Sequence, residues 1–289
     1  MKEILHGKRL ASDYFCKLKV LRLECYPRQI AIFPSYFFQL LSLPNLEKLE
    51  IKHCYFKEMV FQSESVGGEE KPASASMVLS QLTELCLVDL EELMHLWKEK
   101  NGFQNLRILR VTGCPKLKSN LVPSSVCFQN LLTLEVQGCS GIIKLVTHST
   151  AKSLVKLREM TISDCEKLEE IIEGSDGGHD EVKDEISFPQ LNLLELTRLS
   201  KLESFCSSGN HTFGFPSLTT VVVQDCQKMK MFSQGGLNTP MLHKVLLPSN
   251  EAHWIGPIWG NEEHWIWEGS LNSTIQQLFK ERVCFFKFP

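Results

Sequence analysis

One hydrophobic pattern recurs along most of the chain. It runs as an apolar residue, two variable residues, an apolar residue, one variable residue, an apolar residue, two variable residues and then often a cysteine. The segment LRILRVTGC at residues 106–114 shows this frame clearly, and LLTLEVQGC at residues 131–139 repeats it. Nine segments follow the frame at intervals of 24 to 36 residues, and their first leucines are Leu18, Leu46, Leu82, Leu106, Leu131, Leu157, Leu191, Leu218 and Leu242. Recurrence at such intervals is typical of a repeat protein.

Each frame predicts a short β-strand. The central apolar residues alternate with variable residues, so the leucines face one side of the strand and the variable residues face the other. One unit cannot bury its apolar side alone, so neighbouring units stack and their strands join in a parallel sheet. We therefore predict an α/β repeat fold. This is a leucine-rich-repeat solenoid, a horseshoe with a parallel sheet on its concave face and an irregular or short-helical convex side.

The cysteine of the frame has a structural interpretation. It lies where the chain turns away from the sheet, and a small buried thiol there can donate weakly to a backbone carbonyl. A metal site would need close pairs such as Cys-x-x-Cys, which the sequence lacks. Neighbouring cysteines of this ladder are near enough to oxidise in vitro, although a reducing cytosol disfavours disulfides. The ladder cysteines are Cys54, Cys114, Cys139, Cys165 and Cys226.

Two segments interrupt the repeats. Residues 62–76 and 173–185 are rich in Gly, Ser and acidic residues, which predicts mobile loops. The second segment carries six acidic residues and one lysine. We interpret it as a tolerated insertion, and an acidic contact loop is the alternative.

The composition changes after the ninth repeat, so we assign residues 1–250 to the solenoid and 251–289 to a second unit. Four of the five tryptophans lie between Trp254 and Trp267. An open solenoid end exposes apolar core, and we expect these tryptophans to cap it. A tryptophan-lined ligand pocket is the alternative. The segment SLNSTIQQLFKERV predicts a tail helix that begins with a capping box of Ser273 and Gln276.

Charge and hydropathy exclude several classes of partner and location. The chain has 31 basic and 34 acidic residues and a net charge of −3, so neither a nucleic acid nor an anionic membrane is expected as partner. The first residues carry scattered charges where a signal peptide needs an apolar core. No apolar run approaches the roughly 18 residues of a membrane span. We therefore expect a cytoplasmic, or alternatively nuclear, location and no membrane span.

The sequence lacks the common motifs of catalysis and nucleotide binding. It contains no Gly-x-x-x-x-Gly-Lys-Ser/Thr phosphate loop, no Gly-x-Ser-x-Gly elbow and no His-Glu-x-x-His pair. We therefore expect no enzymatic activity, no cofactor and no bound metal.

The variable residues of the frame form the candidate binding site. They face solvent on the concave side and mix both charges with apolar residues, which suits a protein partner better than a nucleic-acid backbone. Taken singly, each is also compatible with ordinary surface variation. The candidate protein-binding residues are Arg22, Lys48, Glu50, Lys52, Glu84, Ile108, Arg110, Glu135, Glu159, Leu193, Glu195 and Val222.

Several segments resemble one known family over nearly the whole chain. FQNLRILRVTGCPKLKS, the Glu-rich insertion between CEKLEEII and FPQLNLLEL, and the terminal WEGSLNSTIQQLF are similar to the repeat region of plant disease-resistance proteins. These are nucleotide-binding leucine-rich-repeat proteins of the coiled-coil type. The resemblance implies the sensor region of an intracellular immune receptor, which recognises a pathogen effector or a modified host protein and restrains an ATPase switch.

The sequence departs from that family in one respect, because the nucleotide-binding domain and the coiled coil are absent from it. Switching and signalling therefore do not follow for this chain alone. A stand-alone cytosolic repeat adaptor, for example for protein turnover, is the alternative. A secreted receptor ectodomain is a third interpretation, opposed by the missing signal peptide and by the repeat type.

Overall fold

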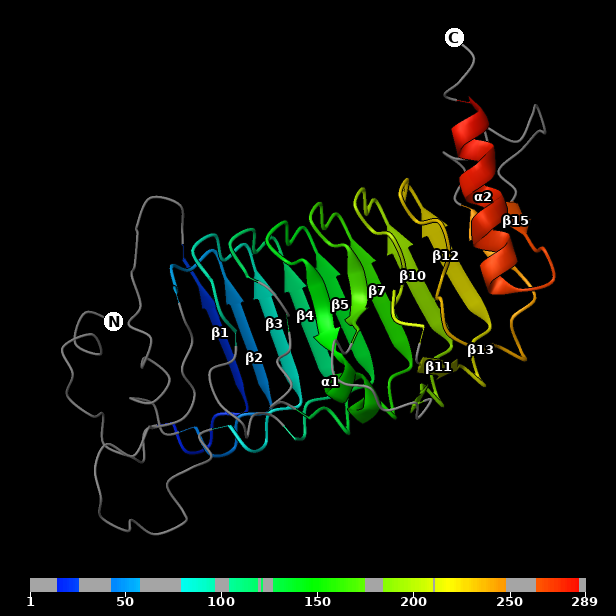
Figure 1. Cartoon of the computed structure of the whole chain (residues 1–289). Helices are drawn as coiled ribbons and strands as arrows, with labels where there is room; N and C mark the ends of the chain where they lie inside the picture. Colours follow the sequence, from blue (N-terminus) through cyan, green and yellow to red (C-terminus); the bar gives the residue numbers. More distant parts are fainter. Residues whose placement is uncertain are drawn as a thin grey trace, which may run out of the picture.

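The fold is a stack of repeats around one long sheet. The computed structural model describes residues 15–25, 43–57, 79–96, 104–118, 121, 127–174, 184–209, 211–247 and 264–285. The predicted loop 62–76 lies outside these ranges. In Figure 1 the long strands stand side by side in chain order, and the last strand and helix lie at the C-terminal end.

Each of the nine frames contributes one strand to this sheet. All nine are parallel, and a tenth strand pairs antiparallel with the ninth. In spatial order the strands are β1 (Val20–Glu24), β2 (Lys48–Lys52), β3 (Glu84–Val88), β4 (Ile108–Thr112), β5 (Thr133–Gln137), β7 (Glu159–Ser163), β10 (Leu193–Thr197), β12 (Thr220–Gln224), β14 (Val245–Leu247) and β15 (His264–Ile266).

Equivalent positions of the frame lie opposite one another across the sheet. Leu109 on β4 faces Leu85 on β3 and Leu134 on β5, and all three side chains are buried. Burial alternates along the full length of β3 and β5, as period-2 geometry requires. The predicted leucine-rich-repeat solenoid with a parallel sheet is therefore confirmed.

Two tight turns flank each strand and explain the apolar positions outside it. Before the strand, the Leu82 amide donates to the Leu79 carbonyl three residues earlier, at 3.1 Å. After the strand, the Leu117 amide donates to the Cys114 carbonyl, again three residues earlier, at 3.2 Å. Equivalent hydrogen bonds recur in most repeats, and the apolar residues of both turns are buried. The apolar residues outside the strand lie three residues apart because they are the first and last residues of a hydrogen-bonded turn. Both of these residues point into the core.

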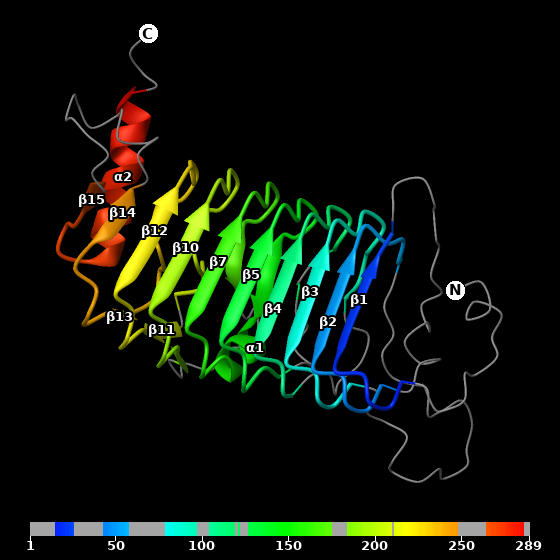
Figure 2. The ribbon, with the colours of Figure 1, turned by 180° about the vertical axis from the view of Figure 1, so that it is seen from behind.

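A second layer lies behind the sheet, on its core side. It contains the helix α1 (His148–Ser153) and two short parallel sheets, β6–β8 and β13–β11–β9. Figure 2 labels α1, β11 and β13 of this layer. Among the described residues, the convex side thus holds one short helix, as allowed by the prediction, and short strands that were not predicted. Their bounds are β6 (Lys144–Thr147), β8 (Glu170–Glu173), β9 (Asp184–Ser187), β11 (His211–Gly214) and β13 (Leu237–Asn238).

The prediction of a loop over residues 173–185 is wrong at both of its ends. Glu173 is the last residue of β8, and Glu185 lies in β9, opposite Thr212 of β11. The acidic composition suggested a loop, but Ile186 and Phe188 are fully buried and draw the end of this segment into the second layer. Residues 175–183 lie outside the described ranges.

The C-terminal helix α2 (Leu271–Phe285) begins earlier than predicted. Its cap is Ser270, whose Oγ accepts from the Ser273 amide at 3.1 Å, so the predicted capping box at Ser273 lies inside the helix. The helix buries Leu271, Ile275 and Leu278 against the core. The division of the chain near residue 250 stays a prediction.

One asparagine ties α2 to the preceding repeat. The Asn272 Oδ1 accepts from the amides of Phe232 and Ser233 at 2.9 and 3.0 Å, and its Nδ2 donates to the Ser233 carbonyl at 2.8 Å. The side-chain amide thus satisfies three backbone groups of the last turn. This contact fixes the helix on the solenoid by polar geometry as well as by burial.

The alternation of faces gives a direct test of the fold. We expect Leu109→Asp to destabilise the repeats around β4 by about 4 kcal/mol or more, because it places an unpaired charge in the core. The neighbouring Ile108→Asp is the matched control, since Ile108 points to the opposite, solvent-facing side. Circular dichroism and thermal melting compare the two variants. Equal melting temperatures would contradict the assignment of the two faces.

Candidate functional site: the open face of the sheet

The solvent-facing side of the ten-stranded sheet, here called the open face, carries all twelve predicted binding residues. Arg22, Lys48, Arg110 and Glu159 are exposed, and the other eight are half-buried. The strand register arranges the face in rows, because equivalent residues lie opposite one another. The middle row runs through Arg22, Glu50, Cys86, Arg110, Glu135, Thr161, Glu195, Val222, Leu246 and Trp265. That these residues bind a protein stays a prediction.

The N-terminal half of the open face is a network of ion pairs. Each of the predicted charges there has a partner of opposite sign, mostly on the adjacent strand. The pairs are Arg22–Glu50 at 2.9 Å, Lys52–Glu50 at 2.7 Å, Lys48–Glu84 at 2.7 Å and Arg110–Glu135 at 2.9 Å. These side chains remain partly solvated, so each pair contributes little to stability. Their effect is to fix the positions of alternating charges on the surface.

The Glu50 carboxylate is the centre of this network. The hydrogen bond from Lys52 lowers the pKa of Glu50, and the same bond raises the pKa of Lys52. Arg22 contacts the second oxygen of the same carboxylate. Both partners therefore stay charged over a wider pH range than isolated side chains, and the network persists around neutral pH.

The C-terminal half of the open face differs in character. Within the described part of the chain, Glu159 makes no ion pair, so its exposed charge is available to a partner. Val222, Leu246 and Trp265 lie opposite one another on β12, β14 and β15. Residues directly opposite in an antiparallel pair share a face, so Trp265 lies on the same side as Leu246. This end of the face therefore carries an apolar strip on β12, β14 and β15, and the charge of Glu159 lies two strands from β12, on β7.

Trp265 is the residue that sequence reasoning misplaced. We expected it to cap the core, yet its side chain is 61% exposed, whereas Trp267 is half-buried against the core. The reason is β15, which returns antiparallel along β14 and turns Ile266 inward and Trp265 outward. The repeat frame carries no signal for this return strand.

A row of left-handed backbone conformations borders the open face where the strands end. In the second to eighth repeats, the residue before the cysteine position has a φ of 52° to 64°. Its amide donates to the last strand residue of the next repeat, as from Asp164 to the Thr197 carbonyl at 3.1 Å. Glycine and aspartate tolerate this conformation, whereas an arginine rarely adopts it. The row consists of His53, Asp89, Gly113, Gly138, Asp164, Arg198 and Asp225.

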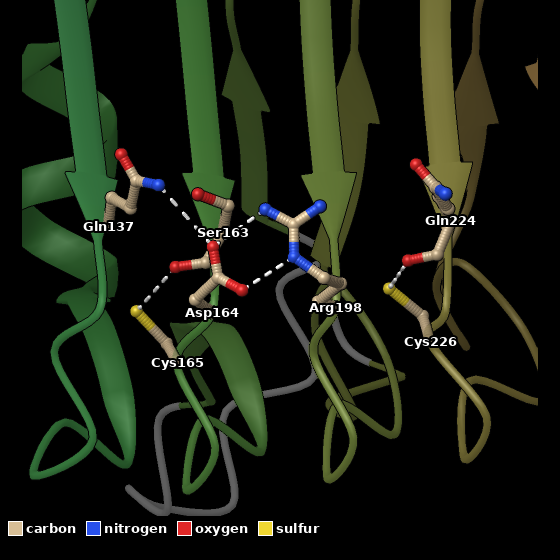
Figure 3. Close-up of polar contacts among 7 residues, drawn as sticks. All are labelled: Gln137, Ser163, Asp164, Cys165, Arg198, Gln224 and Cys226. Carbon is tan, nitrogen blue, oxygen red and sulfur yellow. Dashed lines mark hydrogen bonds and ion pairs between the residues drawn. The ribbon is translucent and has the colours of Figure 1, made fainter. Parts of the chain in front are cut away.

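Arg198 forms a bidentate ion pair that offsets the cost of its left-handed backbone conformation. Its Nε and Nη2 donate to the two carboxylate oxygens of Asp164 at 2.5 and 2.7 Å, and Gln137 donates to the same carboxylate at 3.4 Å (Figure 3). The hydrogen bond from Arg198 lowers the pKa of Asp164. The two side chains line a shallow groove of about 600 Å³ together with Asp225, Lys201 and others. Its lining carries both charges and has no strong preference for an anion or a cation.

The cysteine ladder behaves as predicted. Each of the five thiols is buried and donates to the backbone carbonyl two residues earlier, as Cys165 does to Ser163 at 3.4 Å and Cys226 to Gln224 at 3.4 Å (Figure 3). Burial raises the pKa of Cys165 to about 11, which keeps the thiol protonated as a donor. Across the described ranges, no three His, Cys, Asp or Glu side chains are arranged to hold a metal ion.

Stacked repeats form one parallel sheet, and each variable position of the frame forms a row of solvent-facing residues across it. This architecture is that of a leucine-rich-repeat protein-interaction domain. The model of the family described as "Plant disease resistance protein RPS2-like, leucine-rich repeats" matches residues 1–127 and 119–234. The chain therefore belongs to this family of plant disease-resistance repeats. Among the described residues, no helix is long and apolar enough to cross a membrane.

Two individual proteins are similar to the chain. It is 27% identical over 229 residues to the probable disease resistance protein RF9 of Arabidopsis thaliana, which covers 75% of this chain and 20% of that protein. The chain thus spans about a fifth of the length of that relative. The leucine-rich repeat domain of the type III effector XopL aligns over 78% of this chain and 77% of its own, with a TM-score of 0.46 and 20% identity.

The left-handed arginine provides a stability test. We expect Arg198→Gly to be more stable than Arg198→Ala by about 1 kcal/mol, because both lose the ion pair but only alanine keeps a Cβ in the left-handed conformation. Urea titration measures the two free energies of unfolding. Arg158, an exposed arginine outside the left-handed row, is the control, and there the order of glycine and alanine should reverse. The same order at both sites would mean that Arg198 is not strained.

Proposed function

We propose that the open face binds a protein, and that this chain is the sensing region of a plant immune receptor. The ligand in that proposal is a pathogen effector or a host protein altered by one. Membership of the disease-resistance repeat family supports it. The observation that carries it is the continuous middle row across ten strands, which ends in the exposed Trp265 beside Leu246.

The two halves of the open face suit different parts of one recognition event. An exposed tryptophan next to aliphatic side chains is the kind of anchor that dominates binding energy in protein interfaces. The fixed charges of the N-terminal half, from Arg22 to Glu135, suit the selection and orientation of a partner, because electrostatic complementarity mainly sets specificity and association rate. A partner with apolar anchors at one end and alternating charges at the other is therefore favoured.

The proposal includes a second partner within a longer polypeptide. The relative RF9 is about five times as long as its own segment that matches this chain, so a protein of this family has room for other domains. In such a receptor we propose that the repeats also contact the nucleotide-binding domain and restrain it until the ligand arrives. We place this receptor in the cytoplasm or nucleus, in keeping with the intracellular receptors that the family resemblance implies.

The test compares three single variants of the full chain. We expect Trp265→Ala and Glu159→Lys to lose proteins that co-purify with the wild-type chain from plant cells, while Met241→Ala keeps them. Met241 is a suitable control because it is 55% exposed and apolar but lies outside the rows of the open face. With a purified partner, Trp265→Ala should weaken the Kd about 30-fold, as expected for an interface anchor worth about 2 kcal/mol.

The charged half is tested through one ion pair. Arg110→Glu and Glu135→Arg should each weaken binding, whereas both retain the fold because the pair is solvated. The double variant Arg110→Glu with Glu135→Arg restores the ion pair with its two charges exchanged. A partner whose binding depends on the sign of the charge at each position should still bind this variant weakly. Unchanged affinity for all these variants would refute the open face as the binding site. Capture of a protein-turnover ligase component, with loss in Trp265→Ala, would instead favour the adaptor alternative.

A further inference from the structure

Two cysteines from adjacent repeats lie in direct contact at the N-terminal end of the sheet. The Sγ atoms of Cys25 and Cys54 are 3.0 Å apart. Cys25 follows the last residue of β1, and Cys54 follows β2 by two residues. The first strand pair is therefore joined by a thiol–thiol contact that the ladder hydrogen bonds do not require.

Cys25 differs from the ladder cysteines in its position in the frame. It lies seven residues after its first leucine, Leu18, whereas Cys54 lies eight residues after Leu46. It thus occupies the position of the left-handed row, and its amide donates to the Lys52 carbonyl at 3.1 Å as that row requires. This one-residue offset directs its side chain diagonally toward the neighbouring ladder thiol.

Solvent access also separates Cys25 from all five ladder cysteines, Cys54 included. Cys25 is half-buried, while Cys54 and the other four ladder cysteines are at most 1% exposed. Burial raises the pKa of Cys54, so Cys25 is the group that an external reagent meets first as a nucleophile. An accessible thiol in contact with a buried second thiol is the arrangement that converts a mixed disulfide into an internal one.

A disulfide at this site would leave the Lys52 carbonyl with a donor, although the Cys54 thiol hydrogen bond is lost. A disulfide needs its sulfurs about 2.05 Å apart, so closure requires a movement of about 1 Å. In the reduced state the Cys54 thiol donates to the Lys52 carbonyl at 3.1 Å. When that proton is lost, the same carbonyl still accepts from the Cys25 amide. No buried acceptor is left without a donor.

We propose that Cys25 and Cys54 form an oxidation site that closes to a disulfide with oxidised glutathione. The Cys25 thiolate attacks one sulfur of glutathione disulfide, whose S–S bond breaks and releases one glutathione thiolate. The Cys54 sulfur, on giving up its proton, attacks the Cys25 sulfur of the mixed disulfide and releases the second glutathione. The two cysteines lose two electrons and two protons, and glutathione disulfide becomes two reduced glutathiones. This site does not depend on the proposed binding function.

The disulfide would reinforce the first strand of the sheet, which is less deeply buried than the strand beside it. The core-facing Leu21 and Leu23 of β1 are only half-buried, whereas Leu49 and Ile51 of β2 are buried. The Arg22–Glu50 ion pair of the open face spans the same two strands. Oxidation therefore fixes the N-terminal end of the open face to the next repeat.

The test treats the folded, reduced full chain with oxidised glutathione and maps its disulfides after tryptic digestion. We expect one linked peptide pair, LECYPR at residues 23–28 joined to HCYFK at residues 53–57. Hydrogen exchange at β1 and β2 should slow at least about tenfold on oxidation, because a cross-link suppresses local opening. Dithiothreitol should reverse both changes.

Two variants make the result specific. Cys25→Ser should abolish the linked pair and the slowed exchange, and it should keep the fold because Cys25 is only half-buried. Cys127→Ser, which removes an exposed cysteine elsewhere, should change neither. The proposal is overturned if Cys25 carries glutathione alone, if it links to Cys127, or if the Cys114–Cys139 pair of the buried ladder oxidises first.

Discussion

The in-register stacking of equivalent frame positions is the constraint on which the whole structure depends. No repeat buries its own leucines, because each leucine side chain is covered by the same position of the neighbouring repeats, as Leu109 is by Leu85 and Leu134. A shift of one residue would turn every leucine of a strand toward solvent. The cysteine ladder, the left-handed row and the rows of the open face are further positions of the same frame, so they align as a consequence.

Much of the fold and of the candidate site follows from this frame and was predictable. A strand has only two faces, so the buried leucines assign every variable residue to solvent, and all twelve candidate residues lie there. The thiol hydrogen bonds were predictable for the same reason, since the cysteine position follows the strand at constant spacing. The frame does not reveal which solvent-facing residues contact a partner, because binding depends on the partner's surface as well.

The features that the sequence did not reveal depend on contacts outside the frame. The strand β9 lies at the end of a segment whose acidic composition predicts a loop, and only the burial of Ile186 and Phe188 against other repeats makes it a strand. Trp265 is apolar and aromatic, so composition places it in the core, whereas the antiparallel return of β15 turns it outward. Arg198 adopts a backbone conformation that its residue type disfavours, since the frame requires it and Asp164 holds its side chain.

The ion pairs of the open face have an evolutionary consequence. Arg110 and Glu135 belong to different repeats, 25 residues apart in sequence, yet each is the other's hydrogen-bond partner. A change of charge at one leaves the other facing a like or missing charge. If selection favours binding of a new partner, substitutions at positions 110 and 135 should therefore arise together. Duplication or loss of a single repeat would separate the two members of the ion pair. For this surface we therefore expect the unit of variation to be a pair of adjacent repeats rather than a single repeat.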